Sequence, residues 1–349
     1  MNELVKLILA FFVAFLMAFL STPLAERIAY KIGAIDVPKD SRRMHKKPIP
    51  RLGGIAIFFG FMVGMVMFAV MTREMISIMI ASTLIVILGI FDDRKPLKAI
   101  VKLLVQIVAA LIVIYVGGVK IDAITNPNIF SPNVYLELGW LSVPITVLWI
   151  CGVTNAVNLI DGLDGLAAGI ASISSICIMI IALLTKEYHI AVFTACLAGG
   201  CLGFLPHNFN PAKIFMGDSG STFLGFALAC ISIEGMFKGY AAISFAVPLL
   251  VLALPIFDTT VAILRRVRDH KPIMAPDRGH FHHKLIDMGF SQKQAVGIMY
   301  AISALLGISA IILTGFGMER ALLLLIIAIV FVIATLIFKN THHNDEEDK

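Results

Sequence analysis

Long stretches without a charged side chain recur along the whole sequence, and they restrict the fold more than any other feature. Each is close to the roughly 17 to 25 residues that a helix needs to cross the hydrocarbon core of a bilayer. The chain is 59% hydrophobic and 15% charged, whereas charged residues make up about a quarter of soluble domains. We therefore predict an all-α polytopic membrane protein with about eleven transmembrane helices.

The expected spans and the single predicted domain follow from these runs. The runs cover residues 7–25, 52–71, 75–91, 103–119, 138–160, 165–185, 188–206, 219–233, 239–257, 294–318 and 321–338. We expect one integral-membrane domain over 1–338 and a polar cytoplasmic tail over 339–349. No small-residue cleavage site follows the first run, so we interpret it as a retained helix and not as a signal peptide.

The cysteines are expected to be buried packing residues, and the basic residues indicate the orientation. All five cysteines lie in apolar runs and none forms a CxxC pair, which favours buried packing residues over disulfides or zinc ligands. Most of the 28 lysines and arginines lie in alternate loops on one side. The positive-inside rule makes that side cytoplasmic, so we predict an outside N-terminus and a cytoplasmic C-terminus. Nothing in the sequence is typical of a nucleic-acid module.

The stretch 155–165, Asn-Ala-Val-Asn-Leu-Ile-Asp-Gly-Leu-Asp-Gly, places polar side chains where an apolar run meets water. We expect Asn155 and Asn158 in the last helical turns and Asp161 and Asp164 just beyond. A spacing of three puts Asn155, Asn158 and Asp161 near one helix face. A simple turn or cap is the alternative, but two amides and two carboxylates exceed what a cap needs.

Three further acidic residues belong to the same predicted surface. Asp92 and Asp93 follow the third run, and adjacent carboxylates repel unless a cation or proton compensates, which suggests magnesium binding or a base role. A solvated turn is the alternative. Asp218 precedes the eighth run, where helix capping and metal binding compete as explanations.

Basic side chains in the first and last large loops could bind phosphate. Lys47 and Arg51 lie in the first of these loops, although topology alone would also explain them. The last loop, from Asp258 to Lys293, contains Arg278, His280, His282 and His283. No cysteine or suitably spaced carboxylate completes a zinc site there, so pyrophosphate is the better ligand.

Carboxylates for a metal beside cations for phosphates are what phosphoryl-type transfer needs. Oxygen ligands without thiolates favour Mg²⁺, or Mn²⁺. We therefore place an active site at the cytoplasmic face. An ion-coupled transporter would have its acids at mid-helix instead, and a purely structural membrane subunit would leave the polar loops unexplained.

These loops resemble the polyprenyl-phosphate N-acetylhexosamine-1-phosphate transferases, known as glycosyltransferase family 4. The resemblance runs from about Pro48 to Lys284 through Pro50-Arg-Leu-Gly-Gly54, Phe91-Asp-Asp93, Asn155-Ala-Val-Asn-Leu-Ile-Asp-Gly-Leu-Asp-Gly165, Phe215-Met-Gly-Asp-Ser-Gly220 and His280-Phe-His-His283. The His-x-His-His form is similar to the bacterial branch that uses UDP-GlcNAc and starts teichoic acid or O-antigen type polymers. The phospho-MurNAc-pentapeptide transferases are the alternative branch, but they typically show a three-histidine run.

The resemblance implies magnesium-dependent transfer of GlcNAc-1-phosphate from UDP-GlcNAc to undecaprenyl phosphate in the plasma membrane of a bacterium, with release of UMP. A homodimer is compatible with it. It implies that Asn158 and Asp218 bind the metal, and that Asp92 and Asp93 lie near the metal and the lipid phosphate, where one of the two would act as base. Asp161 and Asp164 would contact the donor or orient the metal ligands. The donor would be bound by Arg278, His280, His282 and His283. Lys47, Arg51 and Asn155 are further candidates for substrate binding. We favour direct attack by the lipid phosphate over a covalent aspartyl intermediate.

Overall fold

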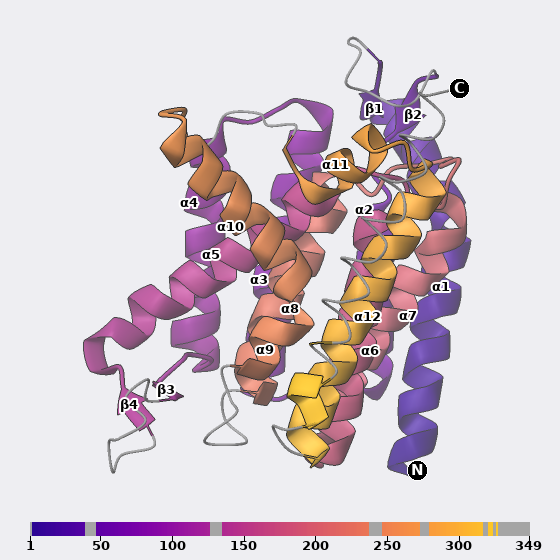
Figure 1. Cartoon of the computed structure of the whole chain (residues 1–349). Helices are drawn as coiled ribbons and strands as arrows, with labels where there is room; N and C mark the ends of the chain where they lie inside the picture. The colour runs from indigo at the N-terminus through magenta and orange to yellow at the C-terminus, as the bar shows by residue number, and fades with distance from the viewer. Residues whose placement is uncertain are drawn as a thin grey trace.

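The computed structural model describes residues 2–38, 47–125, 135–236, 246–272, 279–316, 320–323 and 326. Helices dominate these residues (Figure 1). The helices are α1 (Glu3–Ile32), α2 (Gly54–Phe68), α3 (Arg73–Arg94), α4 (Ala99–Ile112), α5 (Ser142–Ile160), α6 (Leu166–Leu184), α7 (Tyr188–Asn208), α8 (Asp218–Met236), α9 (Ala246–Val251), α10 (Ala253–Arg268), α11 (Phe281–Asp287) and α12 (Gln292–Phe316).

Short elements connect the helices. A π-helical turn, η1 (Val113–Gly117), continues α4, and a 3₁₀ turn, η2 (Gly139–Leu141), precedes α5. The strands β1 (Ile35–Asp36) and β2 (Ile49–Pro50) pair antiparallel, as do β3 (Ala123–Thr125) and β4 (Tyr135–Glu137). The two pairs lie at opposite ends of the helical bundle (Figure 1).

Seven of the described helices are long and apolar enough to cross a membrane, and α2 is a shorter apolar helix. The first eight predicted runs each fall on one helix, from α1 to α8. The all-α polytopic membrane class is therefore confirmed, whereas the count of eleven spans and the orientation stay predictions. The last run lies almost entirely outside the described residues.

Close packing of α1 against α7 shows why small residues recur in these helices. Gly199 and Gly203 are four residues apart on α7, and a Cβ on either would lie 2.3 or 2.2 Å from the carbonyl oxygens of Phe11 and Phe15. Small residues at this spacing allow the backbones of membrane helices to approach each other. The five cysteines are free and buried, as predicted.

Two predicted boundaries are wrong. Asp92 and Asp93 lie within the last turn of α3, which extends to Arg94. The predicted loop from Asp258 to Lys293 contains the second part of α10 and all of α11. Both errors have the same cause, because the predicted helices were ended at the first charged residue. A helix can continue past that residue into water as long as its backbone hydrogen bonds are satisfied.

Candidate functional site

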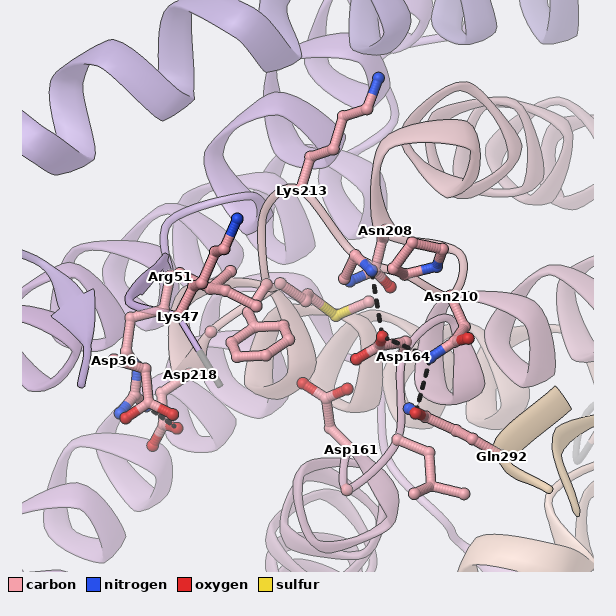
Figure 2. Close-up of a pocket in the computed structure, with 18 of the residues that line it drawn as sticks. Asp36, Lys47, Arg51, Asp161, Asp164, Asn208, Asn210, Lys213, Asp218 and Gln292 are labelled. Carbon is pink, nitrogen blue, oxygen red and sulfur yellow. Dashed lines mark hydrogen bonds and ion pairs between the residues drawn. The ribbon is translucent and has the colours of Figure 1, made fainter. Parts of the chain in front are cut away.

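The helix ends near β1 and β2 surround a cavity with a volume of about 830 Å³. Figure 2 shows its charged and amide side chains, which come from widely separated parts of the chain. The polar lining consists of Asp36, Lys47, Arg51, Asn158, Asp161, Asp164, Asn208, Asn210, Lys213, Asp218, His283 and Gln292. Seven residues predicted from the sequence are therefore in its wall: Lys47, Arg51, Asn158, Asp161, Asp164, Asp218 and His283.

Backbone pairing brings Arg51 to the cavity. Phe215 N–H donates to the carbonyl of Pro50 over 2.8 Å, and Gly53 N–H donates to the carbonyl of Phe215 over 2.9 Å. These bonds join the segment after β2 to the segment that leads into α8. As a result, Arg51 reaches Asp218, which is 167 residues later in the chain.

Two cations share the carboxylate of Asp218. Arg51 Nη2 lies 3.3 Å from Oδ1, and Lys102 Nζ lies 2.9 Å from Oδ2. Lys102 also contacts Asp92 Oδ2 at 3.1 Å, so its ammonium bridges two acidic side chains. From the sequence, Lys102 counts only as one of the basic residues that indicate the orientation. Its position in the first turn of α4, ten residues after Asp92, is the signal that could have marked it.

Asp93 is the N-terminal cap of α8. Its carboxylate accepts the N–H groups of Asp218 and Ser219 at 2.8 and 3.0 Å, the Ser219 hydroxyl at 2.7 Å and Arg51 Nε at 3.2 Å. The side chain is fully buried. A carboxylate at a helix N-terminus satisfies free N–H groups and interacts favourably with the helix dipole. The capping role considered for Asp218 therefore belongs to Asp93, and Asp218 is the first residue of the helix.

Asn158 and Asp161 lie beside each other in the cavity wall. Asn158 Nδ2 donates to Ser221 Oγ over 2.8 Å on α8. Figure 2 shows the Asp161 carboxylate between Asp218 and Asp164, and no hydrogen bond or ion pair joins its carboxylate to another described side chain. Loss of hydration in the cavity, with the nearby charge of Asp218, raises the pKa of Asp161 to about 7. Asp161 is thus a candidate for holding or releasing a proton.

Asp164 fixes the loop between α7 and α8. Its Oδ2 atom accepts Asn210 Nδ2 at 2.9 Å and the Ala212 N–H at 3.0 Å, and Asn210 also donates to Gln292 at 2.6 Å. The loop is therefore tied both to the predicted central stretch and to the start of α12.

Asn155 does not line the cavity. Its Nδ2 atom donates to Gln106 Oε1 over 2.7 Å, between α4 and α5. A spacing of three residues turns a helix by about 300°, so successive members drift around the surface and Asn155 and Asp161 end about 120° apart. Asn158 and Asp161 therefore share the cavity wall, but the expected common face does not include Asn155. The predicted role of Asn155 in substrate binding stays a prediction.

His280 is oriented by Asp258 on α10. The His280 Nδ1 atom lies 2.8 Å from Asp258 Oδ2, and Oδ1 of the same carboxylate accepts the Phe281 N–H at 2.7 Å. One aspartate thus fixes both the imidazole and the first turn of α11. No local pattern in the sequence marks this pair, because 22 residues separate the partners.

His282 is buried against the central stretch. His282 is 1% exposed, and neither of its ring nitrogens has a hydrogen-bond partner among the described residues. A Cβ on Gly162 would lie 2.3 Å from its Nε2 atom, so only glycine leaves room for the ring. Burial, and then the neighbouring His283, lowers the pKa of His282 to about 3, so the ring is neutral. His283 reaches the cavity, whereas Arg278 lies outside the described residues.

The donor atoms at this site fit a hard divalent cation. Asp92, Asn158 and Asp218 offer oxygen atoms, which Mg²⁺ prefers, with water or substrate phosphate at its remaining positions. In the part of the chain that the structure describes, no three His, Cys, Asp or Glu side chains form a ready-made metal cluster. Mg²⁺ therefore stays a prediction, and its sites would be shared with a substrate.

A bundle of membrane helices with carboxylates and cations around one polar cavity defines a polytopic membrane protein that handles charged, phosphorylated molecules. Comparison with known proteins supports the same class. Residues 75–236 match the family described as Glycosyl transferase family 4.

Three relatives extend the match over most of the chain. A probable undecaprenyl-phosphate N-acetylglucosaminyl 1-phosphate transferase of Bacillus subtilis is 41% identical over 332 residues, which are 95% of this chain and 91% of the relative. A decaprenyl-phosphate N-acetylglucosaminephosphotransferase of Mycobacterium tuberculosis is 34% identical, covering 78% of this chain and 74% of the relative. An undecaprenyl-phosphate alpha-N-acetylglucosaminyl 1-phosphate transferase of Salmonella typhimurium is 29% identical, covering 81% and 77%.

The chain therefore belongs to glycosyl transferase family 4. The family predicted from the five motifs is confirmed, as is the prediction that the chain is a phosphoglycosyltransferase.

Proposed function

We propose that this protein transfers GlcNAc-1-phosphate from UDP-GlcNAc to undecaprenyl phosphate in a bacterial plasma membrane and releases UMP, with Mg²⁺ as cofactor. The names of the relatives from Bacillus subtilis and Salmonella typhimurium support the acceptor and the transferred group. UDP-GlcNAc is the donor that contains this group joined to UMP.

The strongest structural support is the shared carboxylate of Asp218. It meets Arg51 and Lys102 at the wall of a cavity that also contains Lys47 and Lys213. A phosphoryl group that enters this cavity meets several cations within one space. The cavity volume of about 830 Å³ lies within the range of small-molecule sites, roughly 300 to 1,000 Å³.

The proposed reaction forms one P–O bond and breaks another. An oxygen atom of the lipid phosphate attacks the phosphorus that carries GlcNAc, and the bond from that phosphorus to UMP breaks. The electron pair leaves with the UMP phosphate. An anionic phosphate needs no deprotonation to act as nucleophile, so positioning and neutralisation of negative charge are the main requirements. Lys47 and Arg51 are placed for this task.

The metal would bind at Asp218, Asn158 and Asp92, where it would neutralise charge on the transferred phosphoryl group. Asp161 lies next to this position and can hold a proton near neutral pH. Asp93 supports the site indirectly, because it fixes the start of the helix that carries Asp218.

UMP release by the purified protein in detergent tests the proposal. Release should require UDP-GlcNAc, undecaprenyl phosphate and Mg²⁺ together, and Asp218→Asn should abolish it in folded protein. Release from UDP-MurNAc-pentapeptide but not from UDP-GlcNAc would assign the chain to the sister branch of the family. No UMP release with either donor would refute the proposed reaction.

A further inference from the structure

A second cavity lies at the end of the bundle opposite the first. It has a volume of about 510 Å³ and is lined by the start of α1, the connection between α2 and α3, the start of α7 and the end of α8. Figure 1 shows the N-terminus of α1 at this end and β1 and β2 at the other. Because α8 begins at Asp218 and ends near Glu234, one helix contributes to both cavities.

The lining of this cavity contains both signs of charge. Its acidic members are Glu3, Glu74 and Glu234, and its basic members are Lys6, Lys186 and His189. Glu234 is nearly buried, so part of the negative charge lies deep in the wall. Carboxylates outnumber lysines, which disfavours a ligand that carries only negative charge.

The cavity is at the boundary between water and the apolar part of the bundle. Two of the helices long enough to span a membrane, α1 and α3, begin with Glu3 and Arg73 next to it. Val70 in its lining is an exposed apolar side chain, and Leu4 and Leu184, which are one and two residues from the lining residues Glu3 and Lys186, are exposed as well. A ligand with a charged head and hydrocarbon tails matches this combination of surfaces.

We propose that this cavity binds the headgroup of a phospholipid that carries a primary ammonium group. Lys6 and Lys186 would hold the phosphodiester, and the glutamates would accept hydrogen bonds from the ammonium group. A choline headgroup offers no N–H donor, and a glycerol headgroup offers no positive charge, so both should bind more weakly. This site is separate from the proposed transferase reaction.

Native mass spectrometry of delipidated protein in detergent can test the assignment. Phosphatidylethanolamine, phosphatidylcholine and phosphatidylglycerol with the same acyl chains should be offered in equal amounts. We expect at least a several-fold preference for phosphatidylethanolamine in the one-lipid adduct. Equal retention of the three lipids, or a preference for phosphatidylglycerol, would overturn the proposal.

Variants locate the bound lipid. Lys6→Met with Glu74→Gln should remove the preference. Lys120→Met should retain it, because Lys120 is outside the cavity lining; it shortly precedes β3, which Figure 1 shows at the same end of the bundle. Gel filtration checks that each variant is folded. If the double variant aggregates, Glu3→Gln on the exposed first turn of α1 is the milder substitute and should weaken the preference. A preference that survives in every folded variant would contradict binding in this cavity.

Discussion

Asp93→Asn is expected to destabilise the protein more than any neighbouring carboxylate-to-amide change. The wild-type carboxylate accepts four hydrogen bonds, two of them from the backbone at the start of α8. An amide keeps one acceptor oxygen, but its NH₂ group replaces the other oxygen and faces donors that it cannot accept from, such as the hydroxyl and the backbone N–H of Ser219 at Oδ2. The Ser219 hydroxyl can rotate to accept, whereas the backbone N–H of Ser219 cannot.

The cost can be worked out from these contacts. Leaving one buried N–H unsatisfied costs about 1–3 kcal/mol, and hydrogen bonds to a charged group contribute about 1.5–3 kcal/mol each. Since an amide can retain some of these bonds, we expect a loss of roughly 2–4 kcal/mol in the free energy of unfolding. Asp218→Asn is the matched control, because only side-chain cations were found on its carboxylate among the described residues. Its loss should be smaller than that of Asp93→Asn, because Arg51 and Lys102 keep Asp93 and Asp92 as partners, whereas we expect activity to be lost.

The five buried cysteines supply the assay, because a thiol-reactive dye labels them only when the bundle unfolds. The midpoint of heat-induced labelling should fall clearly for Asp93→Asn and little for Asp218→Asn. Equal midpoints for wild type and Asp93→Asn would refute the capping role. Loss of activity in a fully stable Asp93→Asn variant would instead support the base role that the sequence suggested.

Three further outcomes are expected. Lys102→Met leaves the carboxylates of Asp92 and Asp218 without the ammonium group that bridges them, so the free energy of unfolding of metal-free protein should fall by roughly 1–3 kcal/mol, after allowance for partial exposure. Added Mg²⁺ should restore the thermal midpoint. The control Lys98→Met, at an exposed residue, should show neither effect. The pKa of Asp161 is about 7 in the folded protein against about 4 in an unfolded chain, so the folded state binds more protons between these values. The free energy of unfolding in EDTA should therefore fall as the pH rises from 4 through 7. If the free energy of unfolding of Asp161→Asn fell with pH as steeply as that of the wild type, this prediction would be wrong. Gly162→Ala should raise the donor KM because its Cβ displaces the buried histidine ring, while Gly152→Ala, with open space around it, should match wild type in donor titrations.

The sequence predicts the membrane class and the helices well, because hydrocarbon demands long apolar segments. It predicts less of the site. Lys47, Arg51 and Asp218 were recognised by type and do meet at one cavity. Lys102 was overlooked because a basic residue beside a membrane helix usually reflects topology.

Partners that only the fold brings together could not be predicted. Asp93 caps α8, whose first residue is 125 positions later in the chain, and Asp258 on α10 contacts His280 at the start of α11. Each of these carboxylates is a common residue with no local spacing that marks it. The central stretch was predicted better, since Asn158 and Asp161 lie within one turn of each other and share the cavity.

The shared carboxylate of Asp218 implies cooperative loading of the site. While Arg51 and Lys102 are paired with it, an incoming cation competes with these two side chains for the Asp218 carboxylate, and an incoming phosphate competes with Asp218 for the two side chains. A divalent ion that takes over the carboxylate frees a cationic side chain, and a phosphate can occupy that freed group. Thermodynamic reciprocity then requires each ligand to raise the affinity of the other by the same factor. The metal concentration for half-saturation should accordingly fall as nucleotide sugar is added, even when no phosphoryl transfer takes place.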